Sequence, residues 1–210
     1  MAGDERSPNF IPLFHRAYGD AIAKLPPPIV RLHDVSRSTT WHGRATVQRG
    51  GSATARLVCK LMGFPPDGDD VALSVEMIPQ NGGEVWQRSF AGHIMTSTLG
   101  MEADGTIVER LPPMASISRI DCDGEGVTQV LVGLRALGLP LPRLLWPKVA
   151  VREGAAGDRY TFSMAIHLPW NQPLVRYDGW LATADAPTGA EQHTEENIHG
   201  QWAQGRRPAL

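Results

Sequence analysis

Between residues 71 and 183, short segments alternate apolar and polar side chains, and this pattern restricts the possible folds more than any other feature. Eight segments show it: VALSVEMI, EVWQRSFAGHIMTST, TIVERL, ASISRIDC, VTQVLVGL, KVAVRE, RYTFSMAIHL and LVRYDGWLAT. A period of two is typical of β-strands that bury one face. The turns QNGG, EADG, DGEG and REGAAGD are rich in residues that adopt positive φ. Strands joined by such short turns run antiparallel.

Two helices and one further strand are predicted ahead of this series. Apolar residues at helical spacing indicate a helix over 8–24, which the prolines at 26–28 should end. The segment TTWHGRATVQRGG alternates like a half-buried strand. A second helix should follow, with Ser52 as N-cap and Gly63 as its stop. Its apolar stripe is predicted to comprise Leu57, Val58, Leu61 and Met62.

We therefore predict an α+β fold. A sheet with this many strands must twist, and a strongly twisted sheet tends to curl or close. The expected architecture is a strongly curved antiparallel sheet or incomplete β-barrel of about 7–9 strands. The two helices near the N-terminus would cover or plug its concave side. A flat sandwich is the alternative.

The chain has 210 residues, which is enough for one substantial core. We predict a disordered N-terminus over 1–7, a single ligand-binding domain over 8–185 and a flexible tail over 186–210. The tail is predicted because its sequence is polar and aperiodic.

Composition argues against several classes of partner. The net charge is −2 and basic tracts are absent, so nucleic acid is a poor candidate. Apolar runs stop well short of the roughly 20 residues that a membrane span needs. The N-terminus lacks the apolar core of a secretory signal. Cys59 and Cys122 lie apart in apolar surroundings, which favours reduced thiols and a cytoplasmic protein.

Several segments together resemble a known family. They are WHGRATVQRGGSATARLVCKLMGFP, EVWQRSF, TIVERLPP, LGLPLPRLLWPKVAVRE, RYTFSMAIHLP and LVRYDGWL. In this order they are similar to the motifs of the bacterial family of domains of unknown function numbered 4166. The resemblance covers residues 10–181. One departure is Trp170-Asn171-Gln172, which stands where a glycine-containing turn is expected.

The resemblance implies a small-molecule role rather than a particular reaction. Members of this family also occur fused behind saccharopine-dehydrogenase-like reductase domains. This implies a ligand that a nicotinamide enzyme also handles, or a separate nicotinamide-dependent reductase as partner. The present sequence has no GxGxxG after a strand, so no dinucleotide cofactor is expected.

The stretch EVWQRSFAG raises the sharpest question about function. Alternation places Trp86, Arg88 and Phe90 on one face, which looks buried. A buried guanidinium needs an anion, and Glu109 is the first choice, with Glu153 as the second. Either this is a structural ion pair that fixes strand register, or Arg88 lines a cavity and binds a ligand. In the second case a carboxylate in the same wall would serve as general acid or base.

Two further strands contribute candidate site residues. In RYTFSMAIHL, Tyr160, Phe162 and Met164 share a face that suits either plain core or an adaptable ligand wall. In LVRYDGWL, the Tyr177 hydroxyl would face either a ligand or a backbone carbonyl. Gly179 beside it indicates a bulge or the close approach of another group.

Metal and histidine chemistry have little support. The seven histidines show no HxH or HExxH spacing and the two cysteines form no CxxC, so no metal site is expected. His33 and Asp34 would form either an oriented base or a loop cap.

Three functions remain open at this point. The first is a binding domain for an apolar or amphipathic, lipid- or polyketide-like molecule, held in an internal cavity of a few hundred Å³ by Trp86, Arg88, Phe90, Tyr160, Phe162 and Met164. The second is a cofactor-free isomerase or cyclase in a biosynthetic pathway, with Glu109, Glu153 or Tyr177 moving a proton. The third is an interaction module for a separate reductase.

Overall fold

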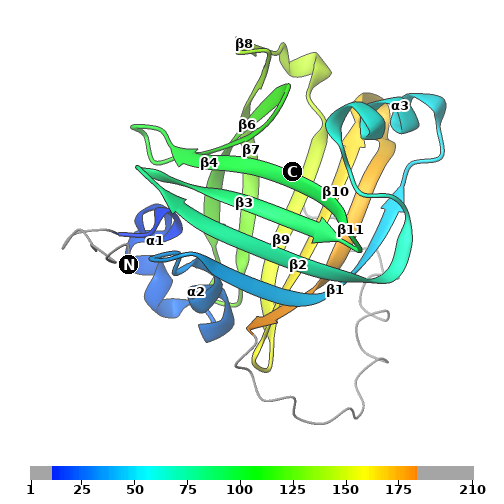
Figure 1. Ribbon diagram of the computed structural model, residues 1–210. Coiled ribbons are helices and arrows are strands. Elements are labelled where there is room, and N and C mark those ends of the chain that lie inside the picture. Colours follow the sequence, from blue (N-terminus) through cyan, green and yellow to red (C-terminus); the bar gives the residue numbers. More distant parts are fainter. Residues whose placement is uncertain (1–10, 184–210) are drawn as a thin grey trace, which may run out of the picture.

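A computed structural model describes residues 11–183, and its main feature is one antiparallel sheet of eleven strands (Figure 1). The strands are β1 Thr39–Arg49, β2 Gly68–Gln80, β3 Gly83–Phe90, β4 His93–Met101, β5 Ile107–Leu111, β6 Met114–Cys122, β7 Val127–Ala136, β8 Leu139–Pro140, β9 Lys148–Ala156, β10 Arg159–Leu168 and β11 Gln172–Thr183. The segments predicted to be disordered, 1–7 and 186–210, lie outside the described residues.

The sheet closes into a barrel of ten strands. From β1 to β7 each strand pairs with the next one along the chain, β7 then pairs with β9, β9 with β10 and β10 with β11, and β11 pairs back with β1. The short strand β8 pairs with β7 outside the ring. The predicted α+β fold with a strongly curved antiparallel sheet is confirmed, but the barrel is more closed than expected.

The higher strand count has a local cause. The segment EVWQRSFAGHIMTST contains two strands, because the chain reverses at Ala91 and Gly92, where φ is 47° and 90°. A two-residue loop with both φ values positive suits the twist of a β-hairpin. Alternation alone does not reveal this turn, because the apolar and polar pattern continues on both sides of it.

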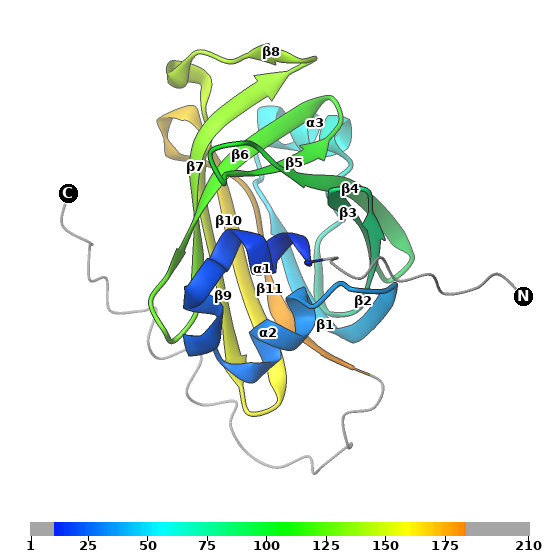
Figure 2. The ribbon, with the colours of Figure 1, turned by 90° about the vertical axis from the view of Figure 1, so that its left-hand side faces the viewer.

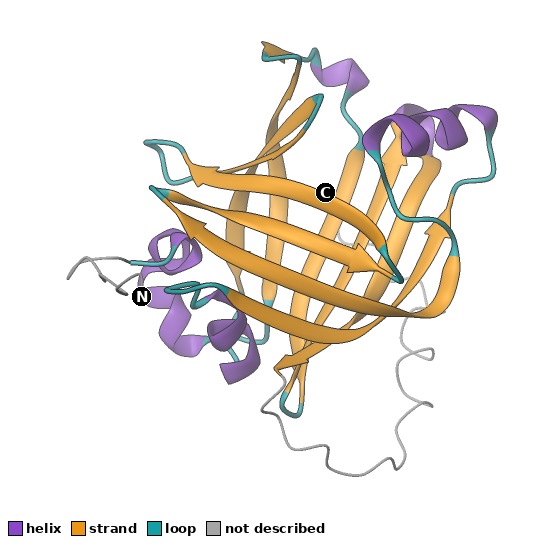
Figure 3. Cartoon of the chain, viewed as in Figure 1, coloured by secondary structure: helices purple, strands orange, loops and turns teal. Residues whose placement is uncertain are grey.

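Two short helices cover one opening of the barrel (Figures 2 and 3). They are α1, Leu13–Tyr18, and α2, Pro27–His33, joined by the 3-10 helix Gly19–Lys24. Helix α1 contacts β4 and β6 and α2 contacts β9 and β10, so the pair spans the opening. The single helix predicted over 8–24 is therefore wrong in detail. The prolines at 26–28 begin α2 instead of ending a helix, because a proline at the first position loses no hydrogen bond.

Helix α3, Ala53–Met62, lies at the other end of the barrel against β11 and β1 (Figure 1). The Ser52 side chain accepts a hydrogen bond from the Ala55 N–H, and Gly63 adopts the left-handed conformation, as predicted. The predicted apolar stripe is wrong in part. Ala55 and Cys59 are the buried side chains, because only small residues fit against the strands there.

Near α3, residues 137–147 leave the barrel as β8 and a 3-10 helix, Arg143–Leu145 (Figures 1 and 2). The three prolines in LGLPLPRLLWP cannot donate to a strand ladder, which favours a position outside the barrel wall. Within residues 11–183, no helix is both long and apolar enough to cross a lipid bilayer.

Candidate functional site

The side chain of Arg88 points into the barrel and is held by two neighbouring strands. Its Nη1 donates to Ser97 Oγ on β4 over 2.8 Å, and its Nη2 donates to Glu109 Oε1 on β5 over 3.0 Å. Ser97 Oγ also donates to the same Glu109 oxygen over 2.7 Å. The Arg88 side chain is 15% exposed, and its Cζ lies 5.1 Å from the centre of the Trp86 ring. The predicted pairing of Arg88 with Glu109 is thus present.

Glu153, the second choice of partner, pairs with a different residue. Its Oε2 lies 2.7 Å from His33 Nε2 on α2, and its Oε1 accepts from Gln129 Nε2 on β7 over 3.2 Å. Glu153 is 4% exposed and His33 is fully buried. The carboxylate therefore connects helix α2 to the inside of the barrel.

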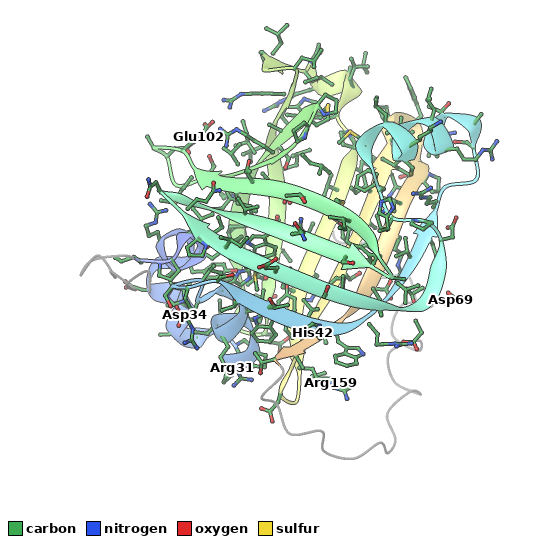
Figure 4. All side chains as sticks on the ribbon, viewed as in Figure 1. Arg31, Asp34, His42, Asp69, Glu102 and Arg159 are labelled. Carbon is green, nitrogen blue, oxygen red and sulfur yellow. The ribbon has the colours of Figure 1, made fainter. Side chains whose placement is uncertain are left out.

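The buried position of His33 was not predicted from the sequence. Because Ile29, Leu32 and His33 are spaced i, i+3 and i+4 on α2, they share its buried face, and this spacing was the signal that could have placed His33 in the interior. Asp34 is exposed on the outside and does not orient the imidazole (Figure 4). Within the described residues, the buried His33 Nδ1 has no hydrogen-bond partner. A buried nitrogen of this kind is normally satisfied by a protein group or an ordered water molecule.

Glu84 is a second buried carboxylate that the sequence reasoning missed. It is 1% exposed, and it accepts hydrogen bonds from the Leu13 N–H over 3.2 Å and from Trp86 Nε1 over 2.8 Å. Burial raises the pKa of Glu84, and the hydrogen bond from Trp86 partly opposes this shift. Its position two residues before Trp86, on the same face of the alternation, was the available signal.

Arg88, Glu109 and Glu153 lie around a small cavity of about 40 Å³, which His33 and Glu84 do not line. Its lining contains Phe14, Trp86, Arg88, Leu99, Ile107, Glu109, Ser116, Ser118, Gln129 and Glu153. The cavity is far smaller than the few hundred Å³ expected, and much of its lining is polar. This end of the barrel interior therefore suits a small polar group better than a bulky apolar one.

The structure separates the nine predicted site residues into two groups. Trp86, Arg88, Glu109 and Glu153 line the cavity. The other five lie elsewhere in or against the buried core: Phe90, Tyr160, Phe162, Met164 and Tyr177.

The second group forms a connected aromatic cluster. The ring centres of Phe90 and Tyr177 are 5.7 Å apart, and those of Phe162 and Tyr177 are 6.4 Å apart. The Tyr177 hydroxyl donates to Met164 Sδ at 3.6 Å, and not to a backbone carbonyl of the described residues. Burial raises the pKa of Tyr177 and also that of Tyr160, where the charge of Glu153 adds to the shift.

Neither metal ligation nor a disulfide is evident in this arrangement. Within residues 11–183, no three or more His, Cys, Asp or Glu side chains are grouped so that they could hold a metal ion. Both thiols are unpaired: Cys59 is buried, and Cys122 is half-buried.

The sequence profile described as "Domain of unknown function (DUF4166)" matches residues 25–181, which include most of the barrel and the His33–Glu153 pair. The chain belongs to this family. No curated protein matches the DUF4166 chain in sequence.

The DUF4166 barrel is similar to a solved structure described as "Crystal Structure of Rv2717c from M. tuberculosis". The alignment covers 76% of this chain and 98% of that one, with 13% sequence identity and a TM-score of 0.40.

Proposed function

We propose that the barrel binds a small amphipathic molecule and that its polar end occupies the cavity beside Arg88 and Glu153. The observation that carries this proposal is the gathering of charged groups around an internal cavity. Buried ion pairs commonly stabilise a protein less than apolar residues of the same volume would. Charges that persist around internal space are therefore better explained by a bound molecule than by stability alone.

The volume and the charges limit the polar end of the ligand. A cavity of about 40 Å³ has room for roughly three water-sized groups. Glu109 compensates Arg88, and His33 and Gln129 bond Glu153. A neutral head with both hydrogen-bond donors and acceptors, such as a hydroxyl or amide group, matches this lining best.

The apolar part of the ligand would extend toward the aromatic cluster of Phe90, Phe162, Met164, Tyr177 and Tyr160. It requires that some of these side chains move. Met164 is suited to this because methionine is unbranched and changes conformation at little cost. We therefore propose the same lipid- or polyketide-like ligand class that the sequence predicts.

Native mass spectrometry of the freshly purified protein tests the proposal. We expect a retained compound in the wild type and a loss of at least tenfold in its occupancy in Arg88→Met, because the charged lining is disrupted. Arg44→Met is the matched control, because Arg44 pairs with Asp70 on the exposed surface over 2.7 Å. Equal occupancy in both variants would contradict the assignment of the cavity.

A specific geometry favours a second candidate, a cofactor-free isomerase or cyclase. Glu153 lines the cavity and shares a 2.7 Å hydrogen bond with His33, which is the arrangement of a general acid or base with an orienting partner. Under this proposal Glu153 moves the proton, while Glu109 holds Arg88 in place. Glu153→Gln would then keep the ligand but abolish its turnover, whereas for a pure binding protein there is no turnover to lose.

We also propose a partner protein and a cellular compartment. A separate reductase, suggested by the family resemblance, would act on the same small molecule. The two unpaired thiols favour a reducing, cytoplasmic compartment.

A further inference from the structure

Large apolar side chains are exposed at the end of the barrel opposite α1 and α2. They come from α3, from the segment around β8, and from the 3-10 helix Pro169–Asn171 between β10 and β11 (Figures 1 and 2). Six of them, here called the apolar rim, are between 66% and 85% exposed: Leu57, Leu61, Leu137, Leu139, Leu144 and Trp170. This exposure is unusual for one region of a folded chain.

Two parts of the apolar rim, the stripe on α3 and the side chain of Trp170, point away from the barrel. Leu57 and Leu61 are one turn apart on α3, so they form a stripe that faces away from the barrel while Ala55 and Cys59 face inward. Trp170 adopts a φ of 64°, which is rare for a bulky residue, and it nevertheless remains 85% exposed. The strained backbone at Trp170 therefore does not bring its side chain into the core that residues 11–183 form.

The segments that carry the apolar rim contain cations only, although Asp67 lies near Cys59 of α3, and Glu102 pairs with Arg135 beside β8 over 2.9 Å. Segments 50–63, 137–148 and 168–172 contain four cationic residues, Arg56, Lys60, Arg143 and Lys148, and no Asp or Glu. The whole chain has 20 Lys and Arg against 22 Asp and Glu, so these three segments differ in charge from the chain as a whole. All four cations are exposed, and none forms an ion pair with a carboxylate within residues 11–183.

We propose that this end of the barrel docks on a lipid bilayer that contains anionic headgroups. Apolar side chains at the tips of separate elements can enter a flat, deformable surface together, and the flanking cations attract the phosphates. A second copy of the chain fits poorly, because a two-fold pair would bring the same four cations face to face. No residue of the apolar rim lines the internal cavity, so docking and ligand binding can be tested separately.

Co-sedimentation of the full chain with vesicles tests this proposal. One set contains phosphatidylcholine alone, and the other contains phosphatidylcholine and phosphatidylglycerol in a ratio of about 7 to 3. We expect binding to the anionic set only, weakening as salt is added. Arg56→Gln with Lys60→Gln should weaken binding about 30-fold, because each cation near the surface contributes about fivefold. Leu57→Ser with Leu61→Ser should weaken it at least tenfold.

Matched controls at the opposite end separate docking from general charge and hydrophobicity. Arg31→Gln with Arg159→Gln removes the same charge at residues labelled in Figure 4. Ile11→Ser removes an apolar side chain that is 57% exposed. Both should bind vesicles like the wild type. Trp170→Gly should bind more weakly without unfolding at a lower temperature, because glycine accepts the positive φ.

Three results would overturn the proposal. The first is no binding to anionic vesicles. The second is equal loss of binding in the rim variants and the controls. The third is concentration-dependent self-association that Leu57→Ser abolishes while vesicles remain unbound, which would assign the face to a protein contact.

Discussion

His33 Nε2 lies 2.7 Å from Glu153 Oε2, although the two residues are 120 positions apart in the chain. His33 ends the helix that covers the barrel opening, and Glu153 lies on the wall inside it. This contact joins α2, which covers the opening, to a carboxylate that lines the cavity. It therefore links the stability of the fold to the geometry of the candidate site.

Removing the Glu153 carboxylate should destabilise the protein strongly. In Glu153→Leu, both His33 Nε2 and Gln129 Nε2 lose their buried partner. We expect the free energy of unfolding in urea to fall by about 3 kcal/mol, as is typical when one member of a buried pair is removed. Glu125→Leu, at an exposed turn, is the control, and its change should stay within about 0.5 kcal/mol. Similar effects in the two variants would refute the structural role of Glu153.

Glu84 should make stability depend on pH in a defined direction. Because burial raises its folded-state pKa above the usual 4.5, the folded state binds the proton more tightly than the unfolded state. Stability from this group is present below about pH 4.5 and is lost as the pH rises through the raised pKa. Glu84→Gln cannot ionise. Its free energy of unfolding should therefore rise relative to that of the wild type as the pH increases from about 4.5 through the raised pKa of Glu84.

Urea unfolding of the wild type and Glu84→Gln between acid and neutral pH measures this difference. The Leu13 N–H and Trp86 Nε1 bond different oxygens of Glu84, and glutamine keeps only one of them, so the variant loses one hydrogen bond at every pH. The titration is therefore measured by how the difference in the free energy of unfolding changes with pH, and not by its absolute value. Parallel pH profiles for the two proteins would show that Glu84 does not titrate with a raised pKa.

Arg88 and Glu109 should be energetically coupled. In a double-mutant cycle with Arg88→Met and Glu109→Leu, we expect a coupling energy of about 1 kcal/mol. The value is moderate because the Glu109 side chain is 34% exposed, so water screens the pair. The exposed pair Arg119 and Asp121 is the control, with an expected coupling near zero. Additive single effects at Arg88 and Glu109 would exclude a structural ion pair.

Gly179 should tolerate no side chain. A Cβ at this position would lie 2.1 Å from the Arg44 carbonyl oxygen and 3.0 Å from the Phe162 ring. Gly179→Ala should therefore lower the free energy of unfolding by about 2 kcal/mol. Gly51→Ala is the control, because a Cβ there meets nothing within 4 Å. A neutral Gly179→Ala would mean that β1 and β11 lie further apart than described.

Several features of the candidate site were predictable from local pattern. Alternation in EVWQRSF placed Arg88 on the buried face, and the cost of burying a guanidinium then required an anion, which is Glu109. A glycine in the middle of a strand likewise predicted a bulge or a close approach at Gly179, and the close approach is present. The exposure of Leu57 and Leu61 was not predictable, because their helical spacing is the same whether the stripe meets a partner or solvent.

The sequence by itself determined the class of structure: antiparallel strands from the period of two, turns from glycine and asparagine, and helix ends from Ser52 and Gly63. These properties depend on neighbours a few residues apart. Tertiary structure alone decided that β1 meets β11, that His33 meets Glu153 across 120 positions, and that the space left inside is small and polar. Such contacts depend on how far the twist of the whole sheet accumulates, which no local segment encodes.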